Sequence, residues 1–201
     1  MTLLLGIGTS SPALSVALFG DGVLLASEHR LIGRGHAEAL VPAIAALMGG
    51  RRADAIVVDV GPGSFTGIRV GIAAARALGL AWGAPVTGVM ASSLVAAAAF
   101  AQAPGLAAVS VLLDAGRGQL FVQQFDRAHR AGDLLTLAPQ DLPAGPAVVH
   151  AGAPASRPEA LAASGPDMSA LLAVPPALRS LAPEAHYVRP PDARLPSGRP
   201  E

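Results

Sequence analysis

The stretch from Ala55 to Ala84 decides the fold, and it reads AIVVDVGPGSFTGIRVGIAAARALGLAWGA. Its opening run, AIVVDV, is rich in β-branched residues, which is typical of a strand buried on both faces. A glycine-rich turn follows, and Ser64 is the expected N-cap of the next helix because its hydroxyl can accept from a backbone N–H. That helix is expected to end near Trp82, where Gly83 and Pro85 stop it.

One face of this helix carries almost no side chains. Gly67, Gly71, Ala74 and Leu78 share that face at helical spacing. Glycine inside a helix costs about 0.5–1 kcal/mol relative to alanine, so a pair on one face indicates a packing constraint. The spacing fits a close neighbour inside the fold and an interface with another chain equally well.

The composition is that of a globular protein with a large core. The chain has 201 residues, of which 52% are hydrophobic and 14% are charged, which excludes a disordered chain. Its formal net charge is zero, which argues against a large nucleic-acid surface of its own. No cysteine is present, so disulfides, thiolate metal sites and thiol catalysis are excluded, and a cytoplasmic location is expected.

Residues 77–113 contain no charged side chain, but they are not expected to span a membrane. A spanning helix needs about 20 predominantly apolar residues in one run. Pro85, the Ser92–Ser93 pair, Gln102 and Pro104 divide this segment into helix, strand, helix and strand. The N-terminal MTLLLGIGTSS also lacks the basic region of a signal peptide.

The remaining patterns predict a mixed sheet covered by helices, followed by a weaker repeat of the same order. Asp21-Gly22 is a strong hairpin signal between the second and third strands. The expected strands are Leu3–Gly8, Leu14–Gly20, Val23–His29, Pro85–Val89, Val109–Leu113, Gln119–Phe125, Leu134–Leu137 and Ala147–His150. The expected helices, besides the one in the deciding stretch, are His36–Met48, Ser92–Ala101, Arg157–Ala163 and Pro175–Leu181.

A glycine turn between a strand and a helix suggests phosphate binding, because the helix N-terminus favours anions. The sequence does not match the specific motifs that carry such a turn. Gly67 is followed by isoleucine where a P-loop has lysine, and no acid follows Asp59 at the distance that a dinucleotide fingerprint needs. Gly63 directly precedes Ser64, which is the wrong spacing for a nucleophile elbow. General anion binding stays open, with phosphate or nucleotide contacts at Thr9, Ser10, Gly61, Gly63 and Ser64.

Neither a catalytic group nor a metal site is expected. His36 has Leu40 where a second helix-borne metal ligand would stand. Asp59 is interpreted as a hydrogen-bond acceptor at the end of its strand. Asp114 ends the first strand of the repeat, where sites of α/β proteins tend to lie, but it has no evident partner.

Several motifs together resemble the TsaB (YeaZ) family. The longest and most specific is GPGSFTGIRVG at Gly61–Gly71. The others, in chain order, are IGTSSPALSVAL at Ile7–Leu18, GRGHAEALVPAI at Gly33–Ile44, DAGRGQLFVQQF at Asp114–Phe125 and AHYVRPPDA at Ala185–Ala193. The resemblance therefore covers nearly the whole chain.

The resemblance implies a two-lobed fold of the actin, hexokinase and Hsp70 type (ASKHA), with mixed sheets, packed helices and an abbreviated second lobe. The lobes would span residues 1–104 and 105–193, and residues 194–201 would form a disordered tail. Gly8 stands where the family usually has an aspartate that related kinases use for phosphate or metal, so independent ATP chemistry is not expected.

The resemblance also implies a non-catalytic partner of TsaD, which forms N6-threonylcarbamoyladenosine on tRNAs that read ANN codons. In that scheme TsaC supplies threonylcarbamoyl-AMP, and TsaE is an associated ATPase that joins through the complex. The chain would have no cofactor of its own, with ATP or ADP allowed at the partner interface, and would meet tRNA through the complex. The alternatives are an ASKHA-type phosphotransferase, an M22-like (glycoprotease-type) peptidase, and a homodimeric scaffold in isolation.

The family pairs with TsaD through its first two helices, so the resemblance favours a partner as the neighbour of the glycine face. The expected interface residues are His36, Leu40, Ile44, Gly67, Ile68, Gly71, Ala74 and Ala75.

Overall fold

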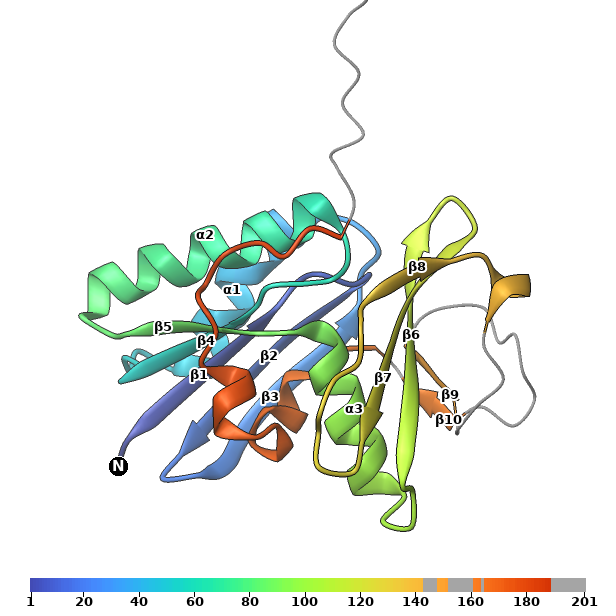
Figure 1. The fold of residues 1–201 in the computed structure, drawn as a ribbon. Helices are drawn as coiled ribbons and strands as arrows, with labels where there is room; N and C mark the ends of the chain where they lie inside the picture. The colour runs from blue at the N-terminus through green and yellow to red at the C-terminus, as the bar shows by residue number, and fades with distance from the viewer. Residues whose placement is uncertain (143–147, 152–160, 164, 189–201) are drawn as a thin grey trace, which may run out of the picture.

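Two mixed five-stranded sheets form the framework in a computed structural model that describes residues 1–142, 148–151, 161–163 and 165–188 (Figure 1). In the first sheet, β1 pairs antiparallel with β2 and parallel with β4, so the sheet is mixed at its centre. Its strands, in spatial order, are β3 (Val23–Leu31), β2 (Ala13–Gly20), β1 (Leu3–Gly8), β4 (Ala55–Asp59) and β5 (Val86–Val89).

The second sheet repeats this arrangement strand for strand. Its central strand also pairs antiparallel with the strand that follows it and parallel with the fourth strand of the lobe. The strands, in spatial order, are β8 (Leu135–Leu137), β7 (Gln119–Asp126), β6 (Ala108–Gly116), β9 (Val148–Ala151) and β10 (Leu161–Ala163). The two-lobed ASKHA-type fold expected from the resemblance is therefore confirmed.

Helices cover both faces of the first sheet. α1 (His36–Met48) and α2 (Phe65–Trp82) pack on the face that carries Val16 and Leu18. The neighbouring Ala17 and Phe19 point to the opposite face and meet α3 (Ala91–Gln102) and the 3-10 helix η2 (Met168–Ala173). α3 lies between the two sheets and packs on both lobes, which explains why its residues are almost all buried (Figure 1).

The structure corrects two of the weaker helix predictions. Residues 161–163 of the expected helix Arg157–Ala163 form strand β10, because parallel pairing with β9 outweighs the helix preference of alanine. The expected helix Pro175–Leu181 is reduced to the 3-10 turn η3 (Pro176–Arg179). Between β8 and β9 the described residues form the 3-10 turn η1 (Pro139–Asp141). Residues 157–160 and the tail 194–201 lie outside the described part of the chain.

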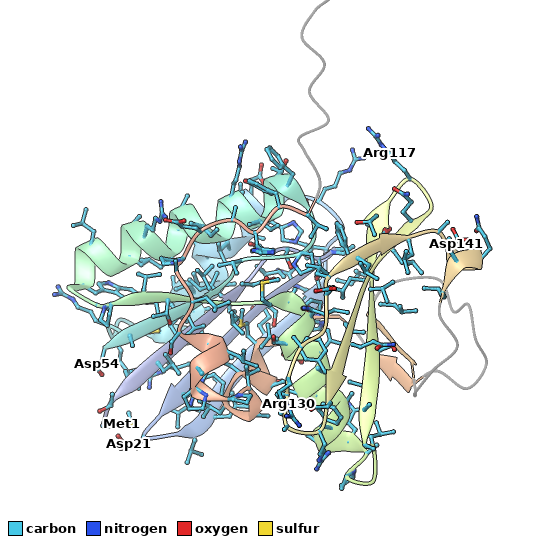
Figure 2. All side chains as sticks on the ribbon, viewed as in Figure 1. Met1, Asp21, Asp54, Arg117, Arg130 and Asp141 are labelled. Atoms are coloured by element: carbon cyan, nitrogen blue, oxygen red, sulfur yellow. The ribbon has the colours of Figure 1, made fainter. Side chains whose placement is uncertain are left out.

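Acidic side chains hold the start of the chain against the first sheet, where Met1, Asp21 and Asp54 lie close together (Figure 2). The backbone N–H of Thr2 donates to Asp21 Oδ1 at 2.7 Å, and that of Leu3 donates to Asp54 Oδ2 at 2.6 Å. These bonds fix β1 between β2 and β4. In the described part of the chain, the helices are too short or too polar to cross a membrane.

Candidate functional site

The glycine turn after β4 is fastened to the turn between β1 and β2. The Ser64 N–H donates to the Ser10 carbonyl at 2.6 Å, and Thr9 Oγ1 donates to the Gly67 carbonyl at 2.7 Å. Ser64 Oγ accepts from the Gly67 N–H at 3.2 Å, which confirms the expected N-cap. A Cβ atom on Gly63 would lie 2.2 Å from the Ser10 carbonyl oxygen, so glycine is required for this contact.

The glycines of the small-residue face, Gly67 and Gly71, pack inside the chain, so the expectation that they meet a partner is corrected, while Ala74 and Leu78 of the same face are partly exposed. A Cβ atom on Gly67 would lie 2.0 Å from the Thr9 carbonyl oxygen, and one on Gly71 would lie 2.5 Å from Thr9 Oγ1. The close neighbour is therefore Thr9, in the turn that follows strand β1. Of the expected interface residues, His36 and Ala74 are partly exposed, while the buried ones are Leu40, Ile44, Gly67, Ile68, Gly71 and Ala75.

The residues expected to contact phosphate use their polar groups inside the chain. Thr9 and Ser10 are buried, and the Ser10 hydroxyl donates to the carboxylate of Asp59. The Gly61 N–H donates to the same carboxylate at 2.8 Å. The Ser64 N–H adds its bond to the Ser10 carbonyl, so these donors join two turns in a junction, and phosphate or nucleotide binding at this turn stays a prediction.

Asp59 is the centre of this junction and is 1% exposed. Burial raises the pKa of its carboxyl from 3.8 to about 6, and the hydrogen bonds from Ser10 and Gly61 offset part of that rise. Its two oxygens accept from two different turns, which confirms the expectation of a strand-end acceptor. The carboxylate thus holds in place the first-lobe wall of the cleft described below.

We expect Asp59→Asn to remove a pH dependence from the stability of the fold. Because the folded-state pKa is raised above the unfolded value of 3.8, the folded chain binds more protons between pH 4 and 6. The free energy of unfolding of the native chain should therefore rise by about 1–2 kcal/mol from about pH 7.5 to about pH 5. Asparagine can accept from Gly61 and donate to Ser10 without titrating. Urea unfolding of both proteins at both pH values measures the difference, and parallel pH profiles would contradict it.

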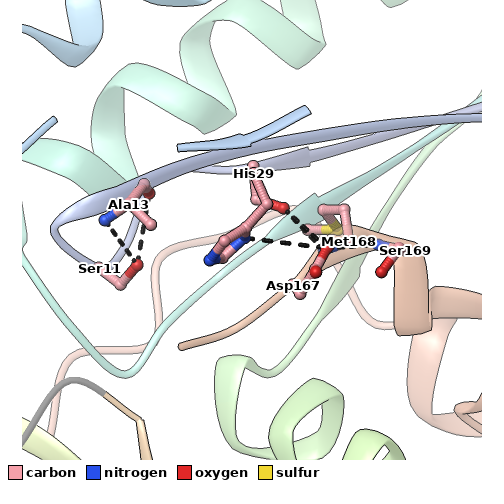
Figure 3. A network of polar contacts seen from close by, with 7 residues as sticks. Ser11, Ala13, His29, Asp167, Met168 and Ser169 are labelled. Carbon is pink, nitrogen blue, oxygen red and sulfur yellow. Dashed lines mark hydrogen bonds and ion pairs between the residues drawn. The ribbon is translucent and has the colours of Figure 1, made fainter. Parts of the chain in front are cut away.

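Packing explains why glycine stands at position 8, where the family usually has an aspartate. A Cβ atom there would lie 3.3 Å from Met168 Cε and 3.4 Å from Ser15 Cβ. Met168 is fully buried under β1, where a hydrogen bond to Ser15 of β2 and a polar contact with His29 of β3 dock the start of η2 (Figure 3). A longer acidic side chain at position 8 would enter the space that the Met168 side chain fills.

The polar contacts in Figure 3 explain why Met168 is held so firmly. Asp167 is the N-cap of η2 and accepts from the Ser169 N–H at 2.8 Å. The Met168 N–H donates to Ser15 Oγ at 2.8 Å, and His29 Nδ1 lies 3.8 Å from Asp167 Oδ1. The chain therefore returns from the second lobe to a fixed position beneath β1.

A cleft of about 940 Å³ separates the two lobes. Asp114 lines it from the second lobe and accepts from the Gly116 N–H at 2.7 Å, so this residue stabilises its own turn. Within the described residues, no group of three histidine or acidic side chains is arranged to hold a metal. The main lining segments are residues 10–12, 33–38, 62–67, 113–116 and 186–188.

A smaller hollow of about 200 Å³ lies between α1 and α2 and is mainly apolar. Val41 is 60% exposed beside it, and Arg51 on its rim donates to the Met48 carbonyl at 2.8 Å. Sequence reasoning named the two helices and Ile44 of this hollow, but not Val41 or Arg51 as site residues. The sequence signal for this surface is the four-residue spacing of three uncharged residues on α1, which the fold exposes: Ala37, Val41 and Ala45. The hollow is lined by Val41, Ile44, Ala45, Met48, Gly50, Arg51, Leu78 and Trp82.

Comparison with known proteins finds similarity across both lobes. A family model described as TsaD, tRNA N6-adenosine threonylcarbamoyltransferase, matches residues 29–174. An uncharacterized protein of Mycobacterium tuberculosis is 32% identical over 161 residues, which are 77% of this chain and 74% of that protein. The tRNA threonylcarbamoyladenosine biosynthesis protein TsaB of Escherichia coli is 33% identical over 129 residues, 62% of this chain and 55% of that protein. The solved structure of YeaZ from Pseudomonas aeruginosa has a TM-score of 0.73 at 30% identity and covers 87% of this chain and 90% of that one.

Proposed function

This chain belongs to the TsaB (YeaZ) family, and we propose that it is the non-catalytic partner subunit of a TsaD-type enzyme. Relatives named as tRNA threonylcarbamoyladenosine biosynthesis proteins support a role in making this modification. In the proposed complex, the TsaD-type subunit carries the transfer chemistry on tRNAs that read ANN codons. The chain contributes a binding surface, and the site of action is the cytoplasm.

The observation that carries the partner role is the apolar outer surface of α1. Ala37, Val41 and Ala45 follow one another at four-residue spacing, and all three are exposed. After Glu38 the helix has no charged residue, whereas a solvent-facing helix side is normally polar. Exposed apolar surface of this kind marks a protein interface.

The hollow beside this surface gives a partner a place to insert a side chain. Leu78 and Trp82 of α2 form its second wall and are partly buried against the first-lobe core. An apolar anchor from the partner would bury them further and cover Val41. The proposed docking surface therefore comprises Ala37, Val41, Ala45, Leu78 and Trp82. This docking surface lies on the two helices that were expected to meet the partner, but it faces solvent and does not include Gly67 or Gly71.

The interior of the first lobe disfavours the phosphotransferase alternative. Met168 fills the space beside Gly8 where a kinase would need its acidic side chain, and Asp59 is buried in the junction between two turns. The peptidase alternative has no specific observation in its favour. A nucleotide shared with the partner stays a prediction, and the cleft between the lobes is the volume that would admit it.

Reconstitution of tRNA modification tests the proposal. The chain, a TsaD-type enzyme, a TsaE-type ATPase and a source of threonylcarbamoyl-AMP are combined with an unmodified tRNA that reads ANN codons. We expect the complete mixture to modify the tRNA, and we expect most of the modified product to be lost when this chain is omitted. The chain alone should turn over neither ATP nor threonylcarbamoyl-AMP. Equal modification without the chain, or turnover by the chain alone, would refute the partner role.

A further inference from the structure

The last described residues run back across the first lobe and then reach toward the second. We call residues 181–188 the strap; in Figure 1 it is the red segment that follows α2 toward the N-terminal end of that helix. Leu181 and Gly88 exchange two backbone hydrogen bonds, of 2.7 and 3.1 Å, at the edge of β5. Arg76 donates to the Pro183 carbonyl at 2.9 Å, and the His186 N–H donates to the Val60 carbonyl at 2.8 Å.

Glycines of the first lobe leave room for the strap. A Cβ atom on Gly88 would lie 2.8 Å from the Ala182 carbonyl oxygen, and one on Gly61 would lie 3.1 Å from the His186 carbonyl oxygen. Leu181 and Ala185 pack against the first-lobe core. The strap is therefore a fitted part of the first lobe as far as residue 186.

The next two residues of the strap contact different lobes. Tyr187 lies on α2, where its hydroxyl accepts from Arg69 Nε at 2.8 Å and its ring centroid is 4.7 Å from that of Phe65. The Arg69 guanidinium carbon also lies 3.7 Å from the centre of the Phe65 ring. Val188 packs against the second-lobe core, which contains Phe121. Phe65, Tyr187 and Val188 all line the cleft between the lobes.

We propose that Tyr187 and Val188 are a latch that holds the two lobes at their observed separation across the cleft. α3 packs on both lobes and gives the connection about which they would turn. The latch residues lie in the wall of the cleft, so a small displacement of the strap would change the width of the cleft. Tyr187 is 40% exposed and Arg69 is exposed, so this end of the latch can open without disturbing the first-lobe core.

Distance measurements between spin labels test the latch, and the absence of native cysteine makes the labelling simple. Ala73→Cys on α2 and Gln124→Cys on β7 place one label on an exposed residue of each lobe. We expect a narrow distance distribution in the otherwise native chain. Tyr187→Ala should broaden it, and Tyr187→Phe, which keeps the ring but loses the hydroxyl, should broaden it less.

A second label pair separates opening of the cleft from general loosening. Ala73→Cys combined with Val23→Cys measures a distance within the first lobe, which should stay unchanged in every latch variant. Val188→Ser leaves the bonds of the strap to the first lobe intact and should still broaden the distance between lobes, even if Tyr187→Ala fails to fold. An unchanged distribution between lobes in Val188→Ser, or equal broadening of both pairs, would overturn the proposal.

Discussion

Gly67→Ala should destabilise the fold by about 3 kcal/mol, because overpacking a tight contact against backbone cannot be relieved by a side-chain movement. The new Cβ atom would lie 2.0 Å from the Thr9 carbonyl oxygen and 3.1 Å from the Thr9 carbonyl carbon. Thr9 directly follows strand β1, and its carbonyl cannot retreat because β2 and β4 hold that strand on both sides. The helix-propensity gain of alanine, about 1 kcal/mol, is too small to compensate. Urea unfolding followed by the fluorescence of Trp82, the single tryptophan, measures the loss.

The matched control is the reverse exchange on the exposed side of the same helix. Ala73 is exposed, so Ala73→Gly should lose only the helix propensity of alanine, about 1 kcal/mol. Gly71→Leu should behave like Gly67→Ala, because its Cβ atom meets Thr9 Oγ1 at 2.5 Å. If Gly67→Ala or Gly71→Leu were as stable as the native chain, the close contact between this face of α2 and Thr9 would be refuted.

Local patterns were sufficient to predict the first lobe because each of its elements has its own signal. Asp21 and Gly22 adopt positive φ angles of 48° and 81°, as a tight hairpin requires, and Gly83 ends α2 in the left-handed conformation. The second lobe lacks such signals near its end. Leu161–Ala163 is a strand only because β9 lies beside it, and a pairing between distant segments leaves no local trace.

The candidate site was less predictable for a related reason. Helical spacing correctly placed Gly67 and Gly71 on one face, but the identity of the neighbour depends on Thr9, which is far away in the sequence. The hydroxyls of Thr9 and Ser10 suit a phosphate as well as they suit a backbone partner. Only the fold shows that the Gly67 carbonyl already engages the Thr9 hydroxyl and that the Asp59 carboxylate already engages the Ser10 hydroxyl. Val41 cannot be told from the core-facing apolar residues of its helix by residue type, and only its exposure in the fold makes it informative.

Val41→Arg should abolish pairing with the TsaD-type partner while leaving the chain folded. Val41 is 60% exposed in the free chain, so an arginine there meets solvent and costs the fold little. In the proposed complex the same guanidinium would be buried against an apolar partner without a counter-charge. Such a penalty should weaken binding by about 100-fold or more. Titration calorimetry of the two purified proteins measures the affinity, and circular dichroism checks the fold.

The control for Val41→Arg adds the same charge to an exposed helix residue far from the proposed docking surface. Gln102 at the end of α3 meets this requirement, and Gln102→Arg should bind the partner like the native chain. Loss of tRNA modification with Val41→Arg but not with Gln102→Arg would link the α1–α2 surface to function. Native affinity in Val41→Arg would instead exclude this surface as the partner interface, even if reconstitution still required the chain. The location of the interface and the partner role are therefore tested by separate results.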